Sequence, residues 1–166
     1  MQLHSVRFLV VDDHQPMREI LKSLLFGLGA RKVEEARDAA QAFEALKFGA
    51  FDLMLTDYDM AGGTGIDLTR MLRRADANPN RRIPIIMITG RAEGPVILGA
   101  RDAGVDEYLI KPLTTASLCQ KLEAVLTRRR PFIETAAYVG PDRRRKVMAY
   151  NGPERRQRRP AAAVAG

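Results

Sequence analysis

The chain has 166 residues, of which 46% are hydrophobic, so it is long enough for one ordinary domain with an appendage. It contains a single cysteine, Cys119, which excludes an internal disulfide and a zinc site built from cysteines. No apolar run reaches the roughly 18 residues of a membrane span, and the N-terminus lacks the pattern of a signal peptide. Together these features predict a soluble, cytoplasmic protein.

The formal net charge of +7 is unevenly distributed along the chain. Residues 1–127 hold 16 Lys or Arg and 17 Asp or Glu, whereas residues 128–166 hold 11 and 3. The basic character therefore belongs to the last 39 residues. We expect a folded domain over residues 1–127 and a basic, largely disordered tail over residues 128–166.

Strand and helix patterns alternate through the first part of the chain. Residues 6–11 are a run of β-branched and apolar residues, typical of a strand that is buried on both faces. Residues 15–28 carry apolar side chains at helical spacing, with Pro16 near the first turn. In chain order, the predicted elements are strand 6–11, helix 15–28, strand 32–36, helix 39–48, strand 51–57, helix 64–74, strand 83–89, helix 93–103, strand 106–110, and a helix to about 127 that Thr114 or Thr115 caps.

This order, strand then helix five times over, predicts a parallel five-stranded sheet with helices on both faces. In such folds ligands bind at the carboxyl ends of the strands, where the strand order reverses. Polar residues follow four of the predicted strands. They are Asp12, Asp13, Asp57, Thr89 and Lys111. Each of them alone would be an ordinary turn or cap residue, but together they bring three carboxylates, a hydroxyl and an amine to one edge.

Three carboxylates at one edge repel one another. Two unit charges 4 Å apart cost about 4 kcal/mol at an effective dielectric constant of 20, and a divalent cation removes that cost. Mg²⁺ prefers one or two carboxylates together with a phosphate oxygen. We therefore interpret Asp12 and Asp13 as metal ligands and Asp57 as a nucleophile toward phosphorus. Lys111 and Thr89 would contact the phosphoryl oxygens.

Four segments, in this order and spacing, make residues 5–127 similar to the receiver domain of two-component response regulators, chemotaxis regulators among them. The segments are "VVDDH", "LMLTDYDM", "IIMITG" and "GVDEYLIKP". The resemblance implies a flavodoxin-like, doubly wound parallel sheet of strand order 2-1-3-4-5 with five helices. It also implies a phosphorelay protein rather than an enzyme, with autophosphotransfer and autodephosphorylation as its own activities. Only 39 residues follow position 127, too few for the usual effector domains, so we expect a stand-alone receiver.

In this family the acceptor, here Asp57, takes a phosphoryl group from a histidine kinase or phosphotransfer protein. Thr89 and Tyr108 are then the switch residues. The surface of the fourth helix, fifth strand and fifth helix would bind a downstream protein in response. The implied Mg²⁺ ligands are Asp12, Asp13, Asp57 and the backbone carbonyl of Asp59.

The chain departs from the family pattern beside the acceptor. Ala61 stands where the family usually has proline, and Asp59 adds a carboxylate that slows phosphoryl arrival, perturbs metal affinity or points to solvent. Asp57-x-Asp59 is also similar to the nucleophile loop of haloacid-dehalogenase-type phosphatases. Those enzymes place Thr or Val at the position of Ala61 and use their first strand, whereas Asp57 ends the third. A further alternative is an unphosphorylated docking module that acts through its tail.

The tail contains the pattern Tyr-x-Gly-Pro-acidic-Arg-Arg twice, at 138–144 and 150–156, with an offset of 12 residues. Three interpretations stay open: a solvated basic tail, a docking motif in two copies that gains from bivalency, and nucleic-acid binding through phosphate contacts and tyrosine stacking. The repeated acidic residue counts against nucleic acid. The candidate interaction residues are Tyr138, Arg143, Arg144, Tyr150, Arg155 and Arg156.

Overall fold

The computed structural model describes residues 2–91 and 93–144. A five-stranded sheet lies at its centre, in the order β2-β1-β3-β6-β7, and every neighbouring pair in it is parallel. Numbered among themselves, these strands have the predicted order 2-1-3-4-5. The sheet elements and helices are β1 (Arg7–Val11), α1 (Gln15–Gly27), β2 (Lys32–Ala36), α2 (Ala39–Phe48), β3 (Leu53–Asp57), α3 (Gly65–Arg74), β6 (Ile85–Thr89), α4 (Gly94–Ala103), β7 (Glu107–Ile110) and α5 (Thr115–Thr127).

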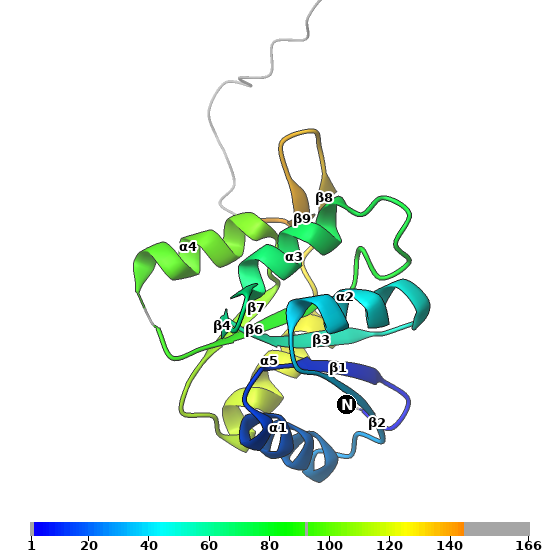
Figure 1. The fold of residues 1–166 in the computed structure, drawn as a ribbon, viewed down its shortest axis with the longest axis vertical. Helices are drawn as coiled ribbons and strands as arrows, with labels where there is room; N and C mark the ends of the chain where they lie inside the picture. Colours follow the sequence, from blue (N-terminus) through cyan, green and yellow to red (C-terminus); the bar gives the residue numbers. More distant parts are fainter. Residues whose placement is uncertain (1, 92, 145–166) are drawn as a thin grey trace, which may run out of the picture.

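Helices cover both faces of this sheet (Figure 1). Because side chains alternate along a strand, Leu9 and Val11 of β1 pack on the side of α2, α3 and α4, whereas Phe8 and Val10 pack on the side of α1 and α5. All four of these side chains are fully buried. The continuous apolar run at the start of the chain is therefore explained by a central strand that is covered on both sides.

Capping side chains mark three of the helix starts in the described residues, and the sequence predicts one of them, the Thr114 cap of α5. Thr114 caps α5 and accepts a hydrogen bond from the backbone N–H of Ser117, and Thr64 forms a capping box with Asp67 at the start of α3. Asp38 caps α2 in the same way. Among the residues that the structure describes, no helix is both long and apolar enough to span a membrane.

Two short hairpins were not predicted. The first joins β4 (Asp59–Met60) to β5 (Gly63–Thr64), directly after the end of β3. The second joins β8 (Phe132–Glu134) to β9 (Val139–Pro141) within the tail, and β9 lies beside α3. The expectation of a largely disordered tail thus does not hold for residues 128–144, which pack on the domain. Residues 145–166, with the second copy of the tail motif, lie outside the described residues.

Candidate functional site

The carboxyl ends of β1, β3, β6 and β7 meet at one edge of the sheet and bring the predicted polar residues together. Asp57 is the last residue of β3 and stands beside Ile88 of β6, while Thr89 ends β6 and stands beside Ile110 of β7. Lys111 follows β7, and its backbone N–H donates to the carbonyl of Thr89 at 2.8 Å. Parallel pairing of adjacent strands therefore places these groups side by side.

Lys111 lies between two buried carboxylates. Its Nζ is 2.6 Å from Asp57 Oδ1 and 3.8 Å from Asp12 Oδ2. Asp12 is 1% exposed and Asp57 is 6% exposed, whereas the Lys111 side chain keeps some contact with solvent. Burial raises the pKa of Asp57, and the charge of Asp12 adds to this, while Lys111 and the backbone N–H of Asp59 oppose it. The site therefore holds more negative charge than one ammonium group compensates.

Two buried oxygens of this site depend on the ammonium group of Lys111 alone. They are Asp12 Oδ2 and Asp57 Oδ1, which lie 3.8 and 2.6 Å from Lys111 Nζ and make no other hydrogen bond within the described residues. The other carboxylate oxygen of Asp12 accepts the backbone N–H of His14 at 2.8 Å. One ammonium group shared by two buried carboxylates leaves negative charge uncompensated, and a further cation would neutralise it.

The third predicted carboxylate, Asp13, is exposed and points toward the loop after β3. Its Oδ2 accepts the backbone N–H of Ala61 at 2.7 Å. Within the described part of the chain, no three His, Cys, Asp or Glu side chains form a ready-made metal cage. A magnesium ion does not require one, since it keeps several waters and uses one or two carboxylates. The oxygens of Asp12 and Asp57 fit such an ion, with Asp13 close by in sequence.

Thr89 is buried, and its hydroxyl is engaged within its own loop. Oγ1 accepts the backbone N–H of Arg91 at 2.9 Å and donates to the carbonyl of Arg91 at 3.3 Å. The hydroxyl must therefore leave these partners before it can contact a ligand beside Asp57.

Asp59 neither enters the site nor points freely to solvent. Its Oδ2 pairs with Nε of Arg91 at 3.1 Å, and the guanidinium of Arg91 lies 5.9 Å from the centre of the Tyr58 ring. The short β4–β5 hairpin carries Asp59 to this position. Gly62 lies in its two-residue turn with a positive φ of 84°, Gly63 begins β5, and this glycine pair was the signal that could have revealed the hairpin.

Tyr108 lies on β7, half-buried against the apolar cluster beneath α4. The ammonium of Lys121 lies 5.4 Å from its ring centre. Tyr108 also lines a groove of about 340 Å³ between α4, β7 and the tail, to which Arg130 and Arg143 contribute. The tail thus reaches the surface that the family resemblance assigns to a downstream partner.

The first tail motif packs against the domain, away from the carboxylates of Asp12 and Asp57. Tyr138 and Arg143 contact the end of α4, and Arg144 bonds to Asp142 within the motif. The predicted residues Tyr150, Arg155 and Arg156 lie outside the described residues.

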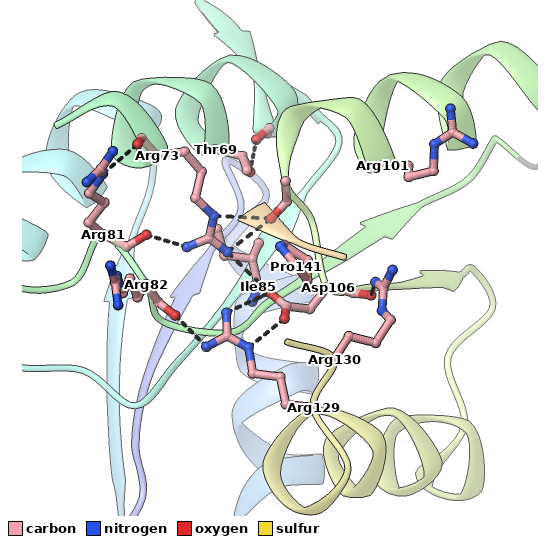
Figure 2. A network of polar contacts seen from close by, with 12 residues as sticks. Thr69, Arg73, Arg81, Arg82, Ile85, Arg101, Asp106, Arg129, Arg130 and Pro141 are labelled. Atoms are coloured by element: carbon pink, nitrogen blue, oxygen red, sulfur yellow. Dashed lines mark hydrogen bonds and ion pairs between the residues drawn. The ribbon is translucent and has the colours of Figure 1, made fainter. Parts of the chain in front are cut away.

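A buried ionic network, which the sequence does not predict, holds the tail (Figure 2). Asp106 accepts from Arg73 of α3 at 3.1 Å, from Arg129 at 2.7 Å and from the backbone N–H of Ile85 at 3.0 Å. Arg73 is 1% exposed, and burial lowers its pKa to about 10 although Asp106 opposes the shift. An arginine in an amphipathic helix normally predicts a solvent-facing position, so no local signal reveals this one.

The comparisons with known proteins all point to one family. The family model "Response regulator receiver domain" matches residues 8–123. The chain is 41% identical over 124 residues to "Chemotaxis protein CheY-3" of Vibrio cholerae, covering 75% of this chain and 94% of the relative. It is also 41% identical over 123 residues to "Chemotaxis protein CheY" of Pseudomonas aeruginosa, covering 74% and 98%.

Solved structures agree with the fold. The chemotaxis response regulator CheY4 of Vibrio cholerae superimposes with a TM-score of 0.67 at 26% identity, over 73% of this chain and 98% of its own. The response regulator TrrA of Thermotoga maritima, solved in complex with Mg(2+)-BeF, gives 0.64 at 28% identity, over 76% and 100%. The matched family model, the two relatives and the shared fold together show that the chain belongs to the response regulator receiver domain family.

Proposed function

We propose that the protein is a signalling switch that accepts a phosphoryl group on Asp57. The observation that carries the proposal is the position of Lys111 Nζ, 2.6 Å from Asp57 Oδ1 and 3.8 Å from Asp12 Oδ2, as one ammonium group that two buried carboxylates share. Such a site is short of positive charge, so it suits a metal ion and a phosphoryl group that arrive together. Family membership supports the same reading, and the relative TrrA was solved with Mg(2+)-BeF.

The residues fit magnesium as its binding partners. We assign Asp12, Asp13, Asp57 and the backbone carbonyl of Asp59 as its ligands. The ion would neutralise charge on the carboxylates and on the phosphoryl oxygens. Asp13 has to turn one oxygen away from Ala61 N–H or share it, since that hydrogen bond measures 2.7 Å.

The transfer step draws on the protein's own residues. A histidine kinase or phosphotransfer protein presents phosphohistidine, and an Asp57 oxygen attacks its phosphorus. The P–N bond breaks, its electron pair stays with the imidazole, and the imidazole takes up a proton from solvent. Lys111 stays near the acceptor and contacts a phosphoryl oxygen, and the hydroxyl of Thr89 leaves the carbonyl of Arg91 to donate to another. The protein is in this view a phosphoacceptor rather than an enzyme acting on a separate substrate, and its location is the cytoplasm, with its kinase.

The output surface comprises α4, β7 and α5. Movement of Thr89 toward the phosphoryl group frees space behind it, into which Tyr108 turns, and this alters the groove that Tyr108 lines. Arg130 and Arg143 of the tail line this groove together with Asp106 and Glu107 of the domain, so the downstream protein would meet a surface of mixed charge that includes the tail.

Intact-protein mass spectrometry after incubation with acetyl phosphate tests the proposal. We expect one phosphoryl adduct that requires Mg²⁺, disappears in Asp57→Asn and persists in the matched control Asp76→Asn, whose carboxylate is exposed. An adduct retained in Asp57→Asn would refute the site assignment. If neither acetyl phosphate nor a phosphorylated kinase labels the protein, the unphosphorylated docking module becomes the better description.

A further inference from the structure

The first copy of the tail motif uses its repeated residues for specific contacts. The hydroxyl of Tyr138 donates to the carbonyl of Pro141 at 2.6 Å, and the guanidinium of Arg143 lies 4.6 Å from the centre of the Tyr138 ring. Arg143 also pairs with Asp102 of α4 at 3.2 Å. Tyrosine, proline and arginine of the motif therefore form one unit that faces the C-terminal end of α4.

The glycine of the motif is required by a close approach between two backbones. A Cβ added to Gly140 would lie 2.6 Å from Cα of Gly104, the residue that ends α4, and 2.7 Å from the Tyr138 hydroxyl oxygen. No side chain fits in that space. The surface around Gly104 and Asp102 is thus a binding site that accepts a chain with glycine at this point and arginine three residues later.

The segment before the motif also has contacts of its own with the domain. Arg129 pairs with Asp106 at 2.7 Å, and Arg130 donates to the carbonyl of Asp106 at 2.5 Å (Figure 2). Strand β8 follows at once and pairs with β9. The backbone N–H of Asp142 closes the hairpin by donating to the carbonyl of Pro131 at 2.7 Å. This anchored strand supplies the second wall of the site.

The sequence repeat duplicates the docked motif 138–144 but not strand β8, which forms the second wall of the site. Tyr150, Gly152, Pro153 and Arg155 repeat the contact residues at an offset of 12. At the same offset, β8 corresponds to residues 144–146, whose sequence Arg-Arg-Lys does not resemble Phe-Ile-Glu. The described part of the chain therefore contains one binding site, formed by strand β8 and the surface around Gly104. The sequence contains two copies of the motif, 138–144 and 150–156, that could bind there.

We propose that residues 150–156 are an alternative ligand for this site in the same chain, in exchange with residues 138–144. The exchange lengthens the loop between β8 and the docked motif from the four residues 135–138 to the sixteen residues 135–150. Loop-closure entropy then favours the first copy by about eightfold. The second copy is thus a minor occupant in the wild-type protein, and docking of the second copy would loop out residues 138–149.

Hydrogen exchange of single backbone amides, followed by NMR on the full chain, tests this proposal. In the docked first copy the Asp142 N–H is bonded to the Pro131 carbonyl, and the equivalent amide of the second copy is that of Glu154. Gly140→Val expels the first copy by the clash with Gly104. We expect the Glu154 N–H in this variant to exchange at least tenfold more slowly than in Gly140→Val/Gly152→Val.

The matched control is Gly152→Val, in which Asp142 keeps its wild-type protection. The expected protection of Glu154 in Gly140→Val is independent of protein concentration, because the exchange occurs within one chain. Equal Glu154 exchange in the single and double variants would overturn the proposal. Protection that appears only at high concentration, together with dimers in light scattering, would also overturn it and assign the second copy to another molecule.

Discussion

The backbone N–H of Ala61 donates to Asp13 Oδ2 at 2.7 Å and so joins the loop after β3 to the end of β1. Proline, the usual residue at this position in the family, has no N–H and cannot make this bond. The departure of the sequence from the family pattern thus has a direct geometric effect: one proposed magnesium ligand is held by a backbone donor.

Replacing Ala61 by proline tests that effect. In Ala61→Pro the Asp13 carboxylate loses its donor and becomes fully available, so Mg²⁺ should bind roughly fivefold more tightly, which corresponds to one ordinary hydrogen bond. An NMR titration of the backbone amides with MgCl₂ gives the affinity. Ala61→Ser keeps the N–H and should leave it unchanged. Weaker Mg²⁺ binding in the proline variant would mean that the hydrogen bond orients the ligand.

Asp57→Asn should make the metal-free protein more stable at neutral pH. Because burial raises the pKa of Asp57 above its unfolded value, the folded state holds this proton more tightly than the unfolded chain does. Ionisation as pH rises through the folded pKa therefore removes stability, and asparagine avoids this loss. The melting temperature of the variant should exceed that of wild type at pH 7, by roughly 4 °C per kcal/mol, and the gap should close toward acid pH. A lower melting temperature for the variant at pH 7 would show that the ion pair with Lys111 outweighs burial.

Arg91 should assist the arrival of anionic phosphodonors. It lies beside the site and compensates Asp59 through the contact at 3.1 Å. Removing its charge in Arg91→Ala leaves a bare carboxylate at the entrance, and phosphorylation by acetyl phosphate should slow about threefold at low salt. The effect should fade in high salt because both side chains are exposed. Arg91→Lys is the control that keeps the charge. A rate in Arg91→Ala equal to that of wild type at low salt would rule out steering.

Removing the docked part of the tail should cost stability, whereas removing the rest should not. A chain that ends at residue 127 loses the pairing of Arg129 with Asp106, although Arg73 still contacts that carboxylate. We expect a loss of about 2 kcal/mol in the free energy of unfolding, measured by urea denaturation. A chain that ends at residue 144 is the matched control and should unfold as the full protein does. Equal stability of the two truncated chains would show that the packed hairpin contributes little.

The sequence alone predicts the parallel sheet and the edge of the sheet where the polar residues gather. Buried strands have unbroken apolar runs, and a polar residue directly after such a run has to lie at the edge of a parallel sheet; Asp57 and Thr89 follow this rule. The two-residue strands of the β4–β5 hairpin are too short for any periodicity to predict.

The buried network around Asp106 could not be predicted from the sequence and is visible only in the structure. Arg73 and Asp106 are 33 residues apart in sequence, and each of them alone has the pattern of a surface residue. Arg129 of the tail adds a second cation beside Asp106. Nothing in the composition of a basic segment distinguishes arginines that pack inward from arginines that face water.

The docked segment also changes how the basic charge of the tail acts on its surroundings. Arg128, Arg129, Arg143 and Arg144 each pair with a carboxylate, and Arg130 donates to backbone carbonyls. An arginine that is already neutralised displaces few counterions when it meets a polyanion. The salt dependence of any binding to a phosphate polymer should therefore be much shallower than eleven basic residues would give, because the arginines of residues 128–144 are already part of the protein's own electrostatic balance.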